Sequence, residues 1–269
     1  MTQTHDGAEL LKQVSDLEAE GAALDDLLCT LSEEDWSRTT AFKRWTVYDV
    51  VAHLHFSDHM GMTTMASGEE FKALMRDIQS SGLPMVAYTR RWLGDIAGAS
   101  LRDRWRTLFK ELCQRLAAAD PDHRLTWAGP GMRPRMFATA RQMETWAHGW
   151  EIYDLLGRPR THTDRIYNIA TIGVRTFGWT FANRKLEVPA ALPYVKLTAP
   201  SGAIWEWHDP AADNRVEGDA VGFCQVVTQV RNVADTDLTV IGETARRWMA
   251  MAQCFAGPPE APPAPGSRG

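Results

Sequence analysis

The chain has 269 residues, and its 29 lysines and arginines against 34 aspartates and glutamates give a formal net charge of −5. This acidic balance argues against the basic surface with which proteins bind nucleic acid or anionic membranes, and no apolar run approaches the roughly 18 residues of a membrane span. We therefore expect no nucleic-acid partner, no membrane contact and a small-molecule ligand. At roughly 150 residues per domain, the length suffices for two domains.

The cysteines and the N-terminal segment indicate a reducing compartment. The four cysteines show no CxxC spacing, and we expect buried thiols at Cys29, Cys113, Cys224 and Cys254. The first residues lack the basic and apolar regions of a secretory signal, which predicts a cytoplasmic protein.

Helical periodicity dominates residues 1–157. Apolar residues spaced three and four apart predict helices over 8–31, from Val47 to about Thr63, between 68 and 80, from Ser100 to about Asp120, and over 137–155. Thr46 and Ser100 each precede an aspartate by three residues, as in a capping box. Residues 121–136 contain many prolines and glycines and predict a loop. Antiparallel packing of the helices would bury their apolar stripes and form a helical bundle.

Residues 158–256 have a mixed pattern and predict a smaller α+β domain. We expect a helix from Thr163 to Phe181, a β-hairpin from strands 194–198 and 203–208, and a short strand over 215–217. A helix over 220–230 capped by Asp219, a strand over 238–241 and a helix over 243–255 follow. The tail, residues 257–269, has five prolines in 13 residues and predicts disorder.

Two of the predicted helices carry residues suited to metal binding. His53 borders the apolar stripe of the helix that starts at Val47, while Glu144, His148 and Glu151 share one stripe of the helix over 137–155. A carboxylate and an imidazole four residues apart can share a divalent cation, and a third ligand from a facing helix would complete a His₂Glu site with an open position. The structural alternatives are a packing role for His53 and a surface ion pair between Glu144 and His148.

A rival pair lies on the same helix as His53. His55 and His59 are also four residues apart, but they point more than 100° away from His53 around the helix axis. With Asp58 beside them, we favour a solvated helix face over a second metal site.

Two sequence runs resemble a known family. Residues 45–54 (WTVYDVVAHL) and 144–149 (ETWAHG) are similar to the metal-binding motifs of the mycothiol-dependent maleylpyruvate isomerase family, in the DinB-like superfamily. The resemblance implies an α+β two-domain fold, with a DinB-like four-helix bundle followed by a domain resembling sterol-carrier-protein folds. It implies zinc ligands at His53, Glu144 and His148. Arg231 is the best positional match for the family's substrate-facing arginine, and the segment from Asp235 to Gly257 resembles a branch whose members largely lack an assigned reaction.

The resemblance also implies the cofactors and a reaction. Zinc, or another divalent metal, and the thiol mycothiol would isomerise a cis-unsaturated acid by thiolate addition and elimination. Three alternatives stay open: a mycothiol S-transferase acting on an electrophile, a hydrolase in which Glu151 is the base, and a protein that binds a metal or apolar ligand without catalysis. Glu151 could equally be a group that orients His148 rather than a base. We expect a monomer or a small homo-oligomer.

Overall fold

The protein combines helices with one small sheet. A computed structural model describes residues 5–129 and 131–268, which contain ten α-helices and a four-stranded sheet. The chain divides into two compact units, Met1–Leu155 and Leu156–Gly269. Among the described residues, no helix is both long and apolar enough to cross a membrane.

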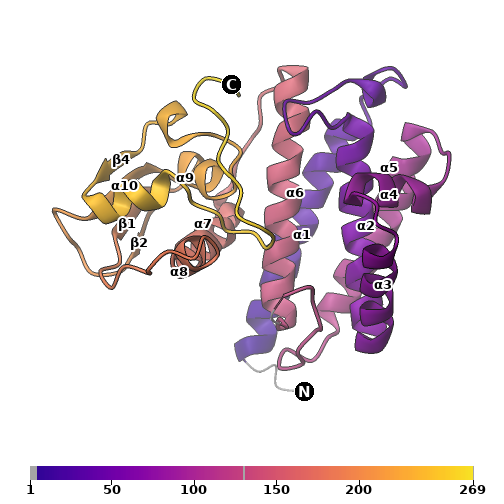
Figure 1. Ribbon diagram of the computed structural model, residues 1–269, viewed down its shortest axis with the longest axis horizontal. Helices are drawn as coiled ribbons and strands as arrows, with labels where there is room; N and C mark the ends of the chain where they lie inside the picture. Colours follow the sequence, from indigo (N-terminus) through magenta and orange to yellow (C-terminus); the bar gives the residue numbers. More distant parts are fainter. Residues whose placement is uncertain (1–4, 130, 269) are drawn as a thin grey trace. The chain divides into compact units, whose positions relative to one another are not determined.

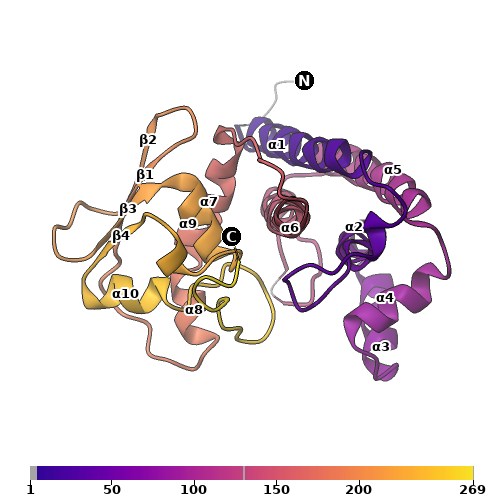
Figure 2. The ribbon, with the colours of Figure 1, turned by 90° about the horizontal axis from the view of Figure 1, so that it is seen from above.

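The first unit is helical and is built around four long helices that lie side by side (Figures 1 and 2). These helices are α1 (His5–Leu28), α2 (Val47–Ala66), α5 (Gly98–Ala117) and α6 (Pro134–Leu156). Two shorter helices, α3 (Gly68–Ser80) and α4 (Met85–Leu93), follow α2 in the chain and pack against it. The sequence predicted the long helices but not α4.

The start of α2 shows the predicted capping box. The Thr46 side chain accepts a hydrogen bond from the Asp49 backbone N–H, and the Asp49 carboxylate accepts one from the Thr46 backbone N–H at 3.0 Å. The capping box predicted at Ser100 is wrong, because α5 already begins at Gly98 and Ala97 is its N-cap without a side-chain bond. Ser100 therefore lies inside the first turn of the helix.

The helix face that carries His55, Asp58 and His59 is not solvated, contrary to the prediction. His55 is 6% exposed and Asp58 is fully buried. Helix α4 covers this side of α2 and brings the Trp92 ring to 5.3 Å from His55 and 4.8 Å from His59. The sequence missed the burial of the two histidines because it missed this covering helix, whereas Asp58 is buried by its contacts with Trp105 and Arg141.

The second unit places helices beside a mixed sheet whose strand order is β2-β1-β3-β4 (Figure 1). The predicted hairpin is confirmed, since β1 (Tyr194–Thr198) pairs antiparallel with β2 (Ile204–Trp207). β3 (Arg215–Asp219) pairs parallel with β1, and β4 (Thr239–Ile241) pairs antiparallel with β3. Asp219 caps α9 (Ala220–Val227), as predicted, by accepting from the Gly222 N–H at 2.7 Å.

Several boundaries in the second unit differ from the predicted ones. The helix expected from Thr163 to Phe181 is divided at Thr176 into α7 (Tyr167–Arg175) and α8 (Phe177–Ala182), and Thr163 makes no side-chain cap bond. The last helix, α10, covers only Glu243–Met249. Cys29 is exposed rather than buried, whereas the other three cysteines are buried as expected.

The proline-rich tail, for which composition predicts disorder, is hydrogen-bonded to the second unit. Gln229 and Arg184 side chains donate to the Glu260 carbonyl, and Asn232 donates to the Pro263 carbonyl at 2.8 Å. The Gly266 N–H donates to the Asp235 carboxylate at 2.8 Å. Prolines lack N–H groups but keep their carbonyl oxygens, so polar side chains of the folded unit can anchor such a segment.

Candidate metal centre

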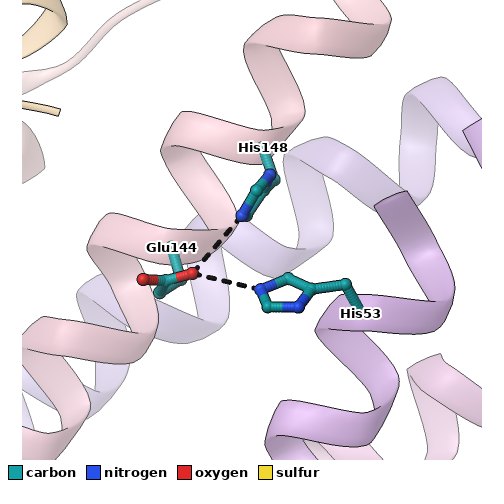
Figure 3. A group of neighbouring side chains, drawn as sticks. All are labelled: His53, Glu144 and His148. Atoms are coloured by element: carbon teal, nitrogen blue, oxygen red, sulfur yellow. Dashed lines mark hydrogen bonds and ion pairs between the residues drawn. The ribbon is translucent and has the colours of Figure 1, made fainter. Parts of the chain in front are cut away.

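Two helices of the first unit bring His53, Glu144 and His148 together (Figure 3). His53 extends from α2, whereas Glu144 and His148 lie one turn apart on α6. Glu144 Oε2 is 3.3 Å from His53 Nε2 and 3.4 Å from His148 Nε2. One donor atom from each residue lies within 4.8 Å of the others. Among the described residues, 5–129 and 131–268, these three side chains form the one group of three or more potential metal ligands that lie close together.

The donor set fits a divalent metal. Tetrahedral zinc with bonds of about 2.0 to 2.1 Å separates neighbouring donor atoms by about 3.4 Å, close to both histidine–glutamate distances here. Imidazole nitrogen and carboxylate oxygen are common zinc ligands, and three protein ligands leave a fourth position open. The side chains are partly buried, with 23%, 26% and 13% exposure for His53, Glu144 and His148.

The protonation states also suit metal binding. Burial lowers the pKa of His53, with the neighbouring His148 adding to that effect and the hydrogen bond to the Glu144 carboxylate opposing it. For Glu144, burial alone would raise the pKa, but hydrogen bonds from His148 and His53 outweigh it and hold the pKa well below its ordinary value. A neutral imidazole and an ionised carboxylate are the ligating forms of these groups.

Aromatic rings of the loop before α2, residues 38–46, cover the two imidazoles. Trp45 stacks nearly parallel on the His148 ring, with centroids 5.8 Å apart and an interplanar angle of 11°, and lies 5.3 Å from the His53 ring. The Phe42 ring meets His148 edge-on at 5.2 Å. These contacts restrict ring rotation and shield the histidines from water. Trp45 belongs to the motif noted in the sequence, but nothing in the sequence singled out Phe42.

A buried ion pair joins the two helices that carry the cluster. Arg141 Nε donates to Asp58 Oδ1 at 2.9 Å, and a second guanidinium nitrogen of Arg141 donates to the Leu54 carbonyl. The Trp105 indole N–H donates to the other Asp58 oxygen at 3.1 Å. Asp58 lies five residues after His53, and Arg141 lies three residues before Glu144, so the pair sets the spacing of α2 and α6 beside the cluster. The sequence analysis did not identify this pair.

The two residues predicted to act in catalysis lie outside the cluster of donor atoms. Glu151 is on α6, three residues after His148, and is 4% exposed. Arg231 belongs to the second unit, follows α9, is 7% exposed, and donates to the Val230 carbonyl at 3.1 Å. Their catalytic roles stay predictions.

These features define a class: a two-unit protein whose helical unit holds a His₂Glu cluster suited to a metal. The chain belongs to the mycothiol maleylpyruvate isomerase family, because the family model described as the mycothiol maleylpyruvate isomerase N-terminal domain matches residues 17–153. This finding confirms the resemblance noted in the two sequence motifs.

The chain is also similar to other proteins of known sequence or structure. An uncharacterised Mycobacterium tuberculosis protein, found in strains CDC 1551 / Oshkosh and H37Rv, is 37% identical over 246 residues, which cover 91% of this chain and 96% of the relative. The crystal structure of the mycothiol-dependent maleylpyruvate isomerase is 14% identical with a TM-score of 0.54, covering 81% of this chain and 88% of that chain. Its histidine-to-alanine mutant gives a TM-score of 0.55 at 13% identity and the same coverage. At these identities the solved structures show a shared fold.

Proposed function

We propose that the protein is a metal-dependent enzyme that uses mycothiol. A divalent ion, which we propose to be zinc, would be held by His53, Glu144 and His148. The observation that carries this proposal is the convergence of the three donor atoms within 4.8 Å from two separate helices. The thiol is suggested by the family and by the name of the solved relatives. A metal bound by two neutral imidazoles and one carboxylate would keep a charge of about +1 and would favour an ionised thiol at neutral pH.

The reaction we propose is the cis–trans isomerisation of an unsaturated acid. When bound, the thiol would supply a nucleophilic thiolate for reversible addition to the activated double bond, with the π electrons of that bond taken up by the conjugated carbonyl oxygen. Rotation about the resulting single bond, followed by return of the electron pair and loss of the thiolate, would give the trans acid. Reactant and product therefore have the same atoms, and the thiol is regenerated.

Residues of this chain contribute to that reaction in distinct ways. Glu144 remains ionised, and its Oε2 lies 3.3 Å and 3.4 Å from the Nε2 atoms of His53 and His148, so the three donor atoms face one point. Phe42 and Trp45 limit water beside the histidines. We propose that Arg231 binds a carboxylate of the substrate. For the fold, we propose that the long helices of the first unit form a DinB-like four-helix bundle and that residues 158–256 form a domain of the sterol-carrier-protein kind.

Replacement of one ligand tests the metal centre. His148→Ala should reduce zinc affinity by at least a hundredfold and leave the helical circular dichroism intact, because alanine favours helices and His148 lies on a helix face. Bound zinc is measured by atomic absorption after equilibrium dialysis. His59→Ala, on the rival pair of α2, is the matched control and should keep about one zinc per chain. Full zinc occupancy of the His148→Ala protein would refute the ligand set.

Cobalt substitution tests the thiol. Adding mycothiol to the cobalt-substituted protein should produce a sulfur-to-metal charge-transfer band, and a panel of cis-unsaturated acids should isomerise only when mycothiol is present. An unchanged cobalt spectrum would contradict the thiol proposal. A stable sulfur adduct in place of a trans acid would replace the isomerase proposal with an S-transferase.

A further inference from the structure

Arg141 is hydrogen-bonded to two points of α2 that lie one helical turn apart. Its Nε donates to Asp58 Oδ1 at 2.9 Å, and a second guanidinium nitrogen donates to the Leu54 carbonyl at 3.4 Å. Asp58 is fully buried and Arg141 is 3% exposed. Because a guanidinium holds its donors in a fixed planar fork, the two bonds together restrict sliding of α2 along α6.

The ion pair occupies the same helix faces as the three candidate ligands. On α6, Arg141 lies three residues before Glu144 and seven before His148, so all three share one stripe. On α2, the Leu54 carbonyl belongs to the residue that directly follows His53. A displacement of α2 along α6 by one turn, about 5.4 Å, would therefore separate His53 from Glu144 and break both bonds of Arg141.

Apolar contacts between these helices specify their register less sharply than the ion pair does. The Phe137 ring of α6 packs against α2 at Gly61, where an added Cβ would come within 2.9 Å of the ring. Apolar burial is non-directional, and hydrophobic cores tolerate small shifts with repacking. Metal ligands, in contrast, need side-chain positions accurate to about 0.5 Å. A directional polar contact beside the cluster supplies that accuracy.

Stability alone does not account for a charge pair in this position. Burial of two charges carries a desolvation cost, and replacement of a buried ion pair by well-packed apolar residues is often neutral or stabilising. The Trp105 N–H donates to the second Asp58 oxygen at 3.1 Å, so the carboxylate is held from both sides. Buried polar groups of this kind fix a single register in some helical proteins, and here the adjoining metal ligands are what a fixed register serves.

We propose that Arg141 and Asp58 are positioning residues for the candidate metal centre, because they hold α2 and α6 in the register at which the ligands of the two helices converge. The inference rests on the proposed function, since it names the residues that keep its metal ligands in place. It predicts that metal affinity and stability respond differently to an apolar replacement of the pair, which preserves the fold but weakens the metal site.

The test compares zinc binding by full-length variants, measured by competition with a chromophoric chelator. Asp58→Leu with Arg141→Met removes both charges and fills similar space. We expect the zinc dissociation constant to rise about tenfold or more, while the metal-free melting temperature stays within about 5 °C of that of the unaltered protein. In the cobalt-substituted variant, the visible absorption bands should shift or weaken, because they depend on the coordination geometry.

An ion pair between two helices that carry no candidate ligand supplies the matched control. Arg102 of α5 donates to Asp25 of α1 at 2.6 Å, and both side chains are partly buried. Asp25→Leu with Arg102→Met should leave the zinc dissociation constant within twofold of the unaltered value. If Asp58→Leu with Arg141→Met does not fold, Asp58→Asn with Arg141→Met, which keeps an acceptor for the Trp105 N–H, replaces it with the same expected loss of zinc affinity.

Three results would overturn the inference. The first is a zinc dissociation constant within twofold of the unaltered value in a folded variant that lacks the ion pair. The second is an equal loss of zinc affinity in the Asp25–Arg102 variant, and the third is a melting temperature lower by more than about 10 °C in both variants of the Asp58–Arg141 pair. Absence of zinc binding by the unaltered protein would refute the metal centre and the inference together. A missing cobalt–mycothiol band would refute the thiol chemistry alone, because the zinc comparison does not involve the thiol.

Discussion

At the scale of single residues, Asp49 links the start of α2 to α4. Its carboxylate accepts hydrogen bonds from the Thr46 backbone and hydroxyl and forms an ion pair with Arg90 at 2.6 Å. Burial alone would raise the pKa of Asp49, but the hydrogen bonds from Arg90 and Thr46 lower it below its ordinary value. A carboxyl group with a lowered folded-state pKa stabilises the folded protein above its unfolded pKa of about 4.

This linkage predicts a pH-dependent effect of Asp49→Asn. We expect the free energy of unfolding to fall by about 1 to 2 kcal/mol between pH 5 and pH 7, from the lost ion pair and the weakened cap. The difference from the unaltered protein should shrink as the pH falls below 4, because Asp49 itself becomes protonated there. Urea denaturation at a series of pH values measures this difference in the free energy of unfolding. A difference that stays constant down to pH 2 would contradict the stabilising role of the ionised Asp49.

At the scale of elements, the buried ion pair between α2 and α6 determines how closely the ligand-bearing helices approach. Asp58 is fully buried and Arg141 is 3% exposed, so removal of either partner leaves an uncompensated charge in the interior. Burial raises the pKa of Asp58, while the Arg141 guanidinium and the Trp105 hydrogen bond oppose that rise. The sequence places Asp58 and Arg141 83 residues apart.

We expect Arg141→Met to lower the free energy of unfolding by about 3 to 5 kcal/mol, and Asp58→Leu with Arg141→Met to be less destabilised than Arg141→Met alone. Lys12→Met breaks the exposed Lys12–Asp16 pair on α1 and serves as the control, with a loss below about 1 kcal/mol. Urea denaturation gives all three values. A loss of unfolding free energy below about 1 kcal/mol for Arg141→Met would show that the Asp58–Arg141 pair does not hold α2 and α6 together.

At the scale of the whole molecule, the tail of the chain is part of the second unit. Its hydrogen bonds to Gln229, Asn232 and Asp235 connect it to the segments after α9. Removal of residues 258–269 should lower the free energy of unfolding of the second unit by roughly 2 to 6 kcal/mol, because at least four hydrogen bonds, to Arg184, Gln229, Asn232 and Asp235, are lost. Hydrogen exchange should show weaker amide protection in β1 and β3 but unchanged protection in α6. Unchanged protection in β1 and β3 would show that the tail contributes nothing to stability.

Much of the architecture was readable from local patterns. The 3.6-residue periodicity located the long helices, alternation located the β1–β2 hairpin, and Thr46 and Asp219 marked two helix starts correctly. Glu144 and His148 could be placed together because residues four apart share one helix face. These features depend on neighbours within a few residues, so the chain encodes them without reference to the rest of the fold.

Long-range packing decided the remaining features of the site. Only the packing of α2 against α6 brings His53 to 3.3 Å from Glu144, 91 residues away in sequence. The coverage of His55 by α4, the Asp58–Arg141 pair and the position of Phe42 against His148 have the same origin. Contacts between distant segments form where apolar side chains are buried and buried polar groups find hydrogen-bond partners at the same time. A short stretch of sequence does not show which distant side chain will be the partner.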